Sequence, residues 1–255
     1  DHSKCVKMAE TVQVPNYAYC LGLLAFPLGL FVYSKVFPSH AKKINRKFTA
    51  WMCSKVMRRV HAKCIPQKKA LFKSFDLLND SKPLEVLEIG VGPGSNLDFL
   101  PAGCNLSCLE PNLENQPYVE QALKDYPDVH FSRFVKGFAE DMREFEDNTF
   151  DAVILTFTLC SVRHPQKALS EIKRVLKPGG LFFFMEHVAA PRNSGHRRVQ
   201  ETLDWVWPVV VDGCHLARES WSFVEQTGFT SVKLEHFRIK MLPFLSYGLY
   251  GYGMK

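Results

Sequence analysis

Short apolar runs alternate with amphipathic stretches from about residue 81 to the last residue of the sequence. Continuous short apolar runs are typical of strands buried on both faces, and apolar positions three or four apart are typical of helices that cover a sheet. The alternation of the two favours an α/β fold with a doubly wound, mostly parallel sheet. The pattern predicts strands at Leu84–Ile89, Leu106–Glu110, Val129–Phe134, Ala152–Thr156, Leu181–Met185, Ser231–Phe237 and Tyr247–Tyr252. It predicts helices at Ser95–Leu100, Glu114–Asp125, Gln166–Leu176 and Ser220–Gln226.

A long apolar stretch precedes this pattern. Residues 11–34 contain no charged side chain, and Tyr17–Tyr33 is their apolar centre. This length is close to the roughly 20 residues that a helix needs to cross a bilayer. We therefore expect residues 1–34 to be a hydrophobic membrane anchor rather than a core helix or a cleaved signal peptide. Pro27 leaves room for a kink, so a re-entrant or interfacial anchor is open beside a spanning one.

The segment that follows the apolar stretch is basic. Between residues 35 and 73 the chain has Lys and Arg side chains and no acidic one, with Ile44, Phe48, Trp51 and Val60 at helical spacing. Residues 35–80 are therefore expected to form a basic amphipathic interfacial helical segment on an anionic cytosolic leaflet. A solvated helix face without a partner stays open, whereas a nucleic-acid partner is disfavoured because the remainder of the chain is acidic.

A glycine-rich turn follows the first predicted strand. Gly90, Gly92 and Gly94 stand at alternate positions, where a backbone without side chains turns tightly and approaches a ligand closely. Glu88 precedes them, and its carboxylate suits a positively charged ligand better than a pyrophosphate. Glu110 ends the second predicted strand, at the offset of the ribose-binding acid in nucleotide-binding sheets. Together these residues predict a site for a cationic nucleoside, although Glu110 could also be an ordinary surface acid at a strand end.

The motifs resemble a known family. The pattern E-x-G-x-G-x-G, followed by Glu110 and by RVLKPGG at Arg174–Gly180, is similar to class I S-adenosylmethionine-dependent methyltransferases. The segments FTLCSV, FMEHVAA, DGCHLARESW and YGYGMK narrow the resemblance to membrane-associated methyltransferase-like proteins that methylate alkyl thiols. The resemblance covers about residues 81–255. It implies a Rossmann-like fold, S-adenosyl-L-methionine as cofactor, and methyl transfer to a small lipophilic thiol. It also implies attachment to the endoplasmic reticulum and lipid droplets, with the catalytic domain facing the cytosol.

The same resemblance implies the cofactor contacts. Family members often have an acid at the position of Phe138, where it accepts a hydrogen bond from the adenine amino group, and this sequence departs from that pattern. Glu140 or the backbone of Ala139 is expected to replace the acid, although Glu140 could also be an ordinary acid of a first helical turn. The expected cofactor-binding residues are Glu88, Gly90, Gly92, Gly94, Glu110, Ala139, Glu140 and Thr156.

The acceptor side of the site is expected to hold the catalytic groups. His187 ends the fifth predicted strand and is expected to accept the proton of an acceptor thiol, with Asp212 as a second catalytic residue and His215 ranked below both. A purely structural role is an open alternative for each histidine. The eight cysteines show no C-x-x-C pair or Cys/His quartet, so no metal site is predicted, and Cys160 is expected to be a wall residue.

Two other functions stay open. Similar motifs serve methyltransferases that act on lipids such as a quinol or a sterol precursor. A non-catalytic membrane or lipid-droplet protein that keeps the fold is the alternative outside the enzymes, and it would not need the glycines and Glu110 that are present.

Overall fold

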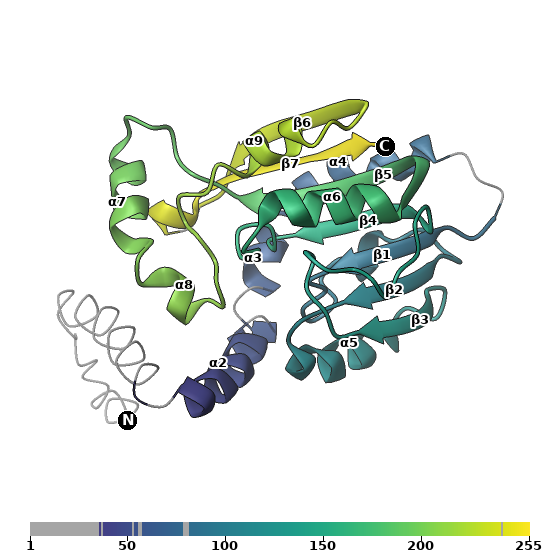
Figure 1. Ribbon diagram of the computed structural model, residues 1–255, viewed down its shortest axis with the longest axis horizontal. Coiled ribbons are helices and arrows are strands. Elements are labelled where there is room, and N and C mark those ends of the chain that lie inside the picture. Colours follow the sequence, from purple (N-terminus) through teal and green to yellow (C-terminus); the bar gives the residue numbers. More distant parts are fainter. Residues whose placement is uncertain (1–35, 37, 53, 56–57, 79–81, 241) are drawn as a thin grey trace, which may run out of the picture.

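The core of the protein is one twisted sheet of seven strands, seen in a computed structural model that describes residues 36–255 except 37, 53, 56–57, 79–81 and 241 (Figure 1). The order of the strands across the sheet is β3-β2-β1-β4-β5-β7-β6. The predicted Rossmann-like, mostly parallel sheet is therefore confirmed. The strands are β1 (Glu85–Ile89), β2 (Asn105–Leu109), β3 (His130–Val135), β4 (Phe150–Thr156), β5 (Leu176–His187), β6 (Ser231–Arg238) and β7 (Tyr247–Met254).

The direction of the strands fixes where a ligand can bind. Strands β1 to β5 pair in parallel, whereas β7 runs antiparallel to both β5 and β6. The chain proceeds outward from β1 to β3 and then returns to place β4 on the other side of β1. This reversal is the switch point at which open α/β sheets bind ligands, beyond the carboxyl ends of the strands.

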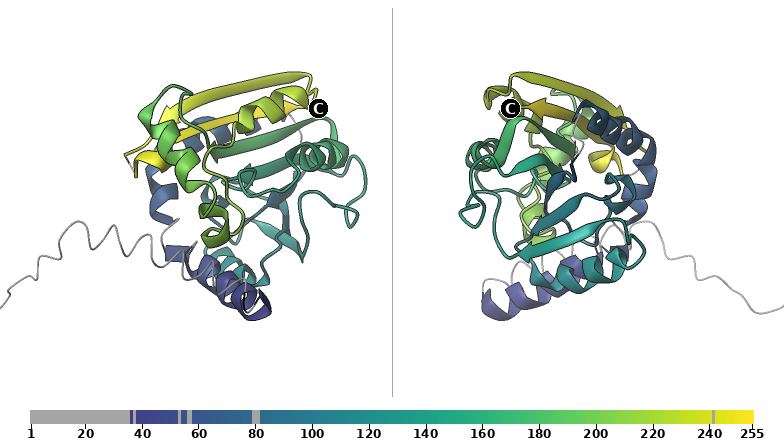
Figure 2. Two further views of the ribbon diagram at one scale, coloured as in Figure 1. Left: turned by 60° about the vertical axis from the view of Figure 1, so that its left-hand side comes forward. Right: turned by 90° about the vertical axis from the view of Figure 1, so that its right-hand side faces the viewer.

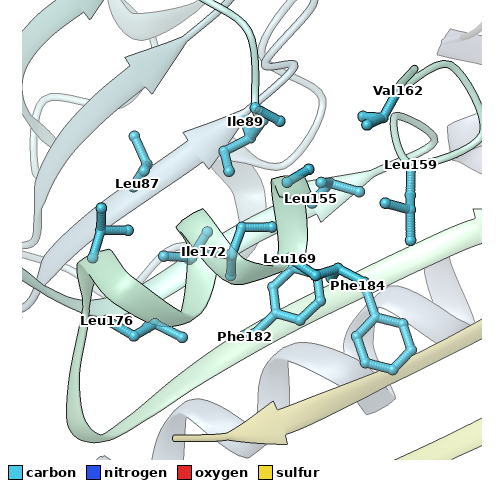
Figure 3. Close-up of a cluster of buried hydrophobic side chains, with 14 of the residues drawn as sticks. Leu87, Ile89, Leu155, Leu159, Val162, Leu169, Ile172, Leu176, Phe182 and Phe184 are labelled. Carbon is cyan, nitrogen blue, oxygen red and sulfur yellow. The ribbon is translucent and has the colours of Figure 1, made fainter. Parts of the chain in front are cut away.

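Helices cover both faces of the sheet. On one face lie α6 (Pro165–Val175) and α9 (Ser220–Gln226), and the apolar side of α6 packs on β1, β4 and β5. Figure 3 shows Leu169 and Ile172 of α6 over Leu155, Phe182 and Phe184 of the strands. Burial of such side chains contributes about 1.5–3 kcal/mol each, so this layer stabilises the sheet strongly.

On the other face lie α4 (Ile65–Phe72), the 3-10 turn at Lys73–Leu77 and α5 (Gln116–Leu123). Phe72 and Phe75 pack against Phe183 of β5, with ring centroids 5.8 and 4.5 Å apart, respectively. Part of the segment expected to be interfacial, 35–80, therefore belongs to the core of the same domain as the sheet. The apolar face of this part is covered by strands rather than by lipid.

Most of the described residues in the remainder of that segment are helical. Helix α2 (Pro38–Met52) is followed by α3 (Arg58–Lys63) and α4. The predicted anchor at residues 1–34 lies outside the described residues. Among the residues that the structure describes, no helix has the length and apolar character needed to cross a membrane.

One predicted helix is wrong, and others differ in their bounds. In place of a helix over Ser95–Leu100, only a 3-10 turn forms at Leu97–Phe99, because Leu100 precedes Pro101 and proline disfavours helical backbone at the residue before it. After a 3-10 turn at Leu113–Asn115, helix α5 begins at Gln116, where Pro117 suits the first turn. Helix α9 has the predicted bounds.

Two helices that the sequence pattern did not predict lie beyond the carboxyl ends of the strands. They are α7 (Gly195–Leu203) and the short α8 (Trp207–Val210), and a 3-10 turn at Pro243–Leu245 contacts α7. Figures 1 and 2 show that α2, α3 and α8 gather at this same end of the sheet. Segments from both ends of the chain thus surround the switch point.

Candidate active site

A cavity of about 830 Å³ lies at the carboxyl ends of β1, β2, β4 and β5. One wall comes from the N-terminal helices α2 and α3, another from the segment around α8, and a third from the segment between β6 and β7. Of the ten predicted site residues, nine line this cavity: Glu88, Gly90, Gly92, Glu110, Ala139, Glu140, Thr156, His187 and Asp212. Gly94, the tenth, belongs to the same glycine-rich turn but not to the lining.

The glycine-rich turn has backbone conformations that only glycine adopts readily. Gly90, Gly92 and Gly94 have φ angles of 68, 53 and 78°, in the left-handed region. A β-carbon on Gly90 would overlap the side chain of Thr158, and one on Gly94 would lie 2.9 Å from Leu97. The turn therefore requires glycine at Gly90 both for its backbone angle and for its close approach to the loop after β4.

Glu88 is fully enclosed between the turn and β4. Asn96 donates a hydrogen bond of 2.8 Å to one of its carboxylate oxygens, and the same amide group donates to Thr156. The other carboxylate oxygen, Oε2, is buried and has no partner among the described residues. Burial raises the pKa of Glu88 to about 7, although the Asn96 hydrogen bond and the charge of Lys68 oppose the shift. This oxygen is free to accept from a ligand.

Glu110 is held by backbone groups at the end of β2. Its two oxygens accept hydrogen bonds from the N–H groups of Gly92, at 3.2 Å, and Asn112, at 2.9 Å. Burial raises the pKa of Glu110 despite these two hydrogen bonds. Asn112 in turn donates to the carbonyl oxygen of Arg46, which ties helix α2 to this part of the cavity. The carboxylate is thus fixed in place and each oxygen keeps acceptor capacity.

The residues predicted to contact the adenine lie on the loop after β3. Ala139 is buried in the cavity wall, whereas Phe138 is about half exposed. One oxygen of Glu140 accepts hydrogen bonds from the N–H groups of Arg163 and His164, at 2.8 and 3.2 Å. The main visible role of Glu140 is to hold the loop after β4 against the loop after β3.

Glu186 and Arg218 hold the loop after β4 through hydrogen bonds to its backbone. Glu186 is fully buried and accepts hydrogen bonds from the N–H groups of Thr158, Leu159 and Cys160. Arg218 donates to the carbonyl oxygens of Leu159 and Val162, both at 2.6 Å. These three backbone contacts compensate the burial of the Glu186 carboxylate.

His187, at the end of β5, lies against a cysteine. Its Nε2 atom lies 2.9 Å from the Sγ atom of Cys214, and its Nδ1 atom is buried without a partner among the described residues. Burial lowers the pKa of His187, whereas Cys160 and Glu186 raise it, and the net shift is upward. The structure thus places His187 next to the cysteines Cys160 and Cys214.

Asp212 lies on the loop that follows α8 and has a left-handed φ of 41°. Its charge contributes to the raised pKa of Glu110, so it belongs electrostatically to the same cavity. His215 contacts Asp204, with 3.0 Å between Nδ1 and a carboxylate oxygen, which fits its lower rank among the expected catalytic residues.

His61 of α3 is a residue of the cavity wall that sequence reasoning missed. Its ring packs edge-on against Phe157, with 5.1 Å between ring centroids, and its Nδ1 atom has no partner among the described residues. Burial lowers the pKa of His61 well below its usual range, and Lys68 adds to the shift, so the ring is neutral at pH 7. The apolar neighbours Val60 and Cys64 in the sequence are the signal that this part of the basic segment is buried.

Comparisons with known proteins agree with this geometry. A family model described as a methyltransferase domain matches residues 87–184, which run from β1 to β5. Thiol S-methyltransferase TMT1B of Rattus norvegicus is 34% identical over 225 residues, which are 88% of this chain and 91% of that protein. Thiol S-methyltransferase TMT1A of Homo sapiens is 36% identical over 191 residues, which are 74% of this chain and 78% of that protein.

A solved structure shows the same fold. It is a SAM-dependent methyltransferase from Thermotoga maritima, described as a possible histamine N-methyltransferase. The TM-score is 0.55 at 19% sequence identity, and the match covers 81% of this chain and 97% of that chain. At 19% identity, the similarity to this structure supports only the arrangement of strands and helices.

Proposed function

The chain belongs to the family of S-adenosylmethionine-dependent methyltransferases that includes these thiol S-methyltransferases, and we propose that it methylates a small lipophilic thiol at a membrane surface. The relatives named for thiol methylation match 88% and 74% of the chain. Membership of the family accounts for the methyl transfer, whereas the thiol acceptor and the membrane surface are proposals.

The residues at the end of β1 and β2 suit the cofactor. Within the described part of the chain, Glu88 has a buried oxygen without a partner, and so does Asn115, which lies beside Glu110. The glycine-rich turn leaves its backbone open to the cavity. We propose that Glu88 faces a cationic part of S-adenosylmethionine, that Glu110 accepts hydrogen bonds from its ribose, and that Gly90, Gly92, Gly94, Ala139, Glu140 and Thr156 complete its site. When bound, the cofactor supplies a methyl group that a positively charged sulfur has activated for displacement.

One observation carries the proposal for the acceptor. The cavity that contains Glu88 and Glu110 continues without interruption to an apolar part lined by Val209, Leu242 and Leu245. A lipophilic acceptor there would share one enclosure with the cofactor. Holding two reactants together in this way supplies up to about 7–11 kcal/mol of the barrier, so the reaction needs few chemical groups from the protein.

The remaining chemical requirement is a group that accepts the proton of the thiol. A thiol with a pKa near 8.5 is partly ionised at neutral pH, so one weak base is enough. We propose His187 and Asp212 for this role, since both line the cavity. With Nε2 of His187 next to the Cys214 sulfur, Nδ1 is the ring atom that is left to accept a proton.

Attachment to a membrane completes the proposal. Helix α2 exposes the apolar side chains of Ile44 and Trp51 together with the basic Lys47. The same helix lines the cavity through Arg46 and Thr49. We propose that residues 1–34 and the exposed face of α2 bind the anionic cytosolic leaflet of the endoplasmic reticulum and of lipid droplets. A lipophilic thiol would then reach the cavity from the membrane.

The test of the acceptor is release of S-adenosylhomocysteine by the detergent-solubilised protein. A small alkyl thiol, a phenol and a quinol are offered separately, with Glu110→Ala as the control for use of the cofactor. Turnover with the thiol alone, lost in the variant, is the expected result. Turnover with the quinol only would establish the lipid methyltransferase instead, and absence of both turnover and cofactor binding would leave a non-catalytic protein.

The test of the membrane proposal is flotation with vesicles. We expect the full chain to float with vesicles that contain anionic lipid, and the double variant Ile44→Ser, Trp51→Ser to float less. A chain that stays at the bottom of the gradient with every lipid composition would contradict membrane attachment without affecting the acceptor.

A further inference from the structure

Three buried side chains from three different elements meet in the cavity wall. Cys160 lies on the loop after β4, His187 ends β5 and Cys214 lies on the loop after α8. One atom of each, two sulfurs and a ring nitrogen, lie within 4.8 Å of one another. All three residues are buried and all three line the cavity. Because each lies in a different segment, no spacing in the sequence reveals the group.

The donors of this group are those of a zinc site. Zinc binds cysteine sulfur at about 2.3 Å and histidine nitrogen at about 2.0–2.1 Å, which puts tetrahedral ligand atoms about 3.5–4 Å apart. Nε2 of His187 lies 2.9 Å from Sγ of Cys214, and all three atoms lie within 4.8 Å of one another, so the distances in the group lie on both sides of that range. Thiolate and imidazole ligands also disfavour magnesium and calcium, which prefer oxygen. Nε2 of His187 is the ring nitrogen that faces the group, since it lies 2.9 Å from the Sγ atom of Cys214.

The polypeptide around the group is firmly held. The backbone N–H group of Cys160 donates a hydrogen bond of 3.2 Å to the carboxylate of Glu186. The backbone N–H group of His215 donates a hydrogen bond of 3.0 Å to the carbonyl oxygen of Cys160. The second bond joins the loop of Cys160 directly to the loop of Cys214. The backbone of His187 is part of the sheet, in register with Gly248 of β7. Ligands held in this way are preorganised for an ion.

We propose that Cys160, His187 and Cys214 bind a zinc ion whose fourth position faces the cavity and takes the sulfur of the acceptor thiol. Structural zinc sites have four protein ligands, whereas catalytic sites have three and an open position. The three ligands found among the described residues lie in a cavity wall and match the second kind. The identity of the fourth ligand rests on the proposed thiol methylation, but the binding of zinc does not.

The ion has a definite chemical task in this arrangement. The acceptor thiol binds to zinc as a thiolate and its proton passes to solvent. An electron pair of that sulfur forms the new bond to the methyl carbon, while the bond between this carbon and the sulfonium sulfur breaks. The products are a thioether, which is a weaker zinc ligand than a thiolate, and S-adenosylhomocysteine. This role of His187 as a ligand replaces the role as a base that is proposed above, because a thiol that coordinates zinc is deprotonated outright.

The first experiment measures the metal content of the full chain purified in detergent with a phosphine reductant and without added chelator. We expect about one zinc per chain in the wild type. Cys160→Ser, His187→Gln and Cys214→Ser should each contain at least fivefold less. The matched control is Cys104→Ser, since Cys104 is also buried but lies at the start of β2, away from the group. Circular dichroism of each variant identifies any that fails to fold.

A folded wild type without zinc, before and after incubation with a zinc salt, would overturn the proposal whatever the variants do. So would equal zinc in the control and in all three variants. If His187→Gln lost activity and kept its zinc, the role of His187 as a base would stand and its role as a ligand would not.

A second experiment observes the fourth position. In the wild type exchanged to cobalt, we expect an absorption band from sulfur-to-cobalt charge transfer, and we expect addition of the alkyl thiol to intensify it and to shift the visible bands. Cobalt bands of the protein that do not respond to any thiol would overturn the open coordination position. Zinc binding without thiol turnover would leave the metal site intact and remove the proposed acceptor.

Discussion

The ammonium group of Lys68 donates a hydrogen bond of 2.8 Å to the carbonyl oxygen of Ser95, from inside the core. Lys68 belongs to α4, and Ser95 follows the last glycine of the turn that lines the cavity. Burial lowers the pKa of Lys68 to about 8, although Glu88 raises it. A basic residue of the N-terminal segment thus supports the glycine-rich turn directly.

Replacement of this lysine should destabilise the fold. In Lys68→Met the carbonyl group of Ser95 loses its partner in a buried place, which costs about 1–3 kcal/mol. We expect a lower free energy of unfolding in urea and a lower melting temperature. Lys69→Met is the matched control, because Lys69 is the exposed neighbour, and its effect should stay within about 0.5 kcal/mol. Equal stability of the two variants would contradict the role given to Lys68.

Gly90→Ala should harm both the fold and the cofactor site. The left-handed backbone of Gly90 disfavours any β-carbon by about 1 kcal/mol or more, and the overlap with Thr158 adds to this. Gly103→Ala separates the two effects, because Gly103 has a similar φ of 76°. The β-carbon of an alanine there would have no atom of the described residues within 4 Å. We expect calorimetry to show weaker binding of S-adenosylhomocysteine for Gly90→Ala only. Unchanged binding in that variant would mean that the turn does not approach the cofactor.

The sheet and half of the site were predictable from the sequence for a physical reason. Buried parallel strands are continuous apolar runs, and Glu88 and Glu110 stand at fixed offsets from the glycines, so local pattern is enough to find them. The helix expected at Ser95–Leu100 fails because Pro101 and the buried Asn96 impose a turn.

The contacts on the acceptor side of the site could not be predicted from local sequence patterns. His61 reaches Phe157 only because α3 folds back over the end of the sheet, and Cys160, His187 and Cys214 meet only in the folded chain. Tertiary contacts between distant segments leave no spacing to recognise. For the same reason the burial of Lys68 cannot be predicted from a segment that contains many other Lys and Arg residues.

Glu110→Gln should weaken cofactor binding with little effect on the sheet. The amide of glutamine puts an N–H donor where the carboxylate accepts from Gly92 or Asn112, and removes the charge that would accept from ribose hydroxyl groups. Hydrogen bonds to charged groups contribute about 1.5–3 kcal/mol, so the Kd for S-adenosylhomocysteine should rise about ten- to hundredfold. Glu114→Gln, at an exposed acid a few residues later, should leave the Kd unchanged. Equal Kd values for both variants would remove Glu110 from the cofactor site.

The affinity for S-adenosylmethionine should rise with pH through the pKa of Glu88. This carboxyl group has a pKa raised to about 7, so its ionised fraction increases between about pH 6 and pH 8, while Lys68 keeps most of its charge over most of that range. If the cation binds next to the ionised form, the Kd should fall about tenfold across this range, and binding near pH 7 should release a proton. Calorimetry in two buffers of different ionisation enthalpy measures that proton. Glu88→Gln should bind more weakly at pH 8 and show no such dependence. A pH dependence that persists in Glu88→Gln would assign the titrating group elsewhere in the cavity, and a flat wild-type profile would mean that the cationic part of the cofactor does not face Glu88.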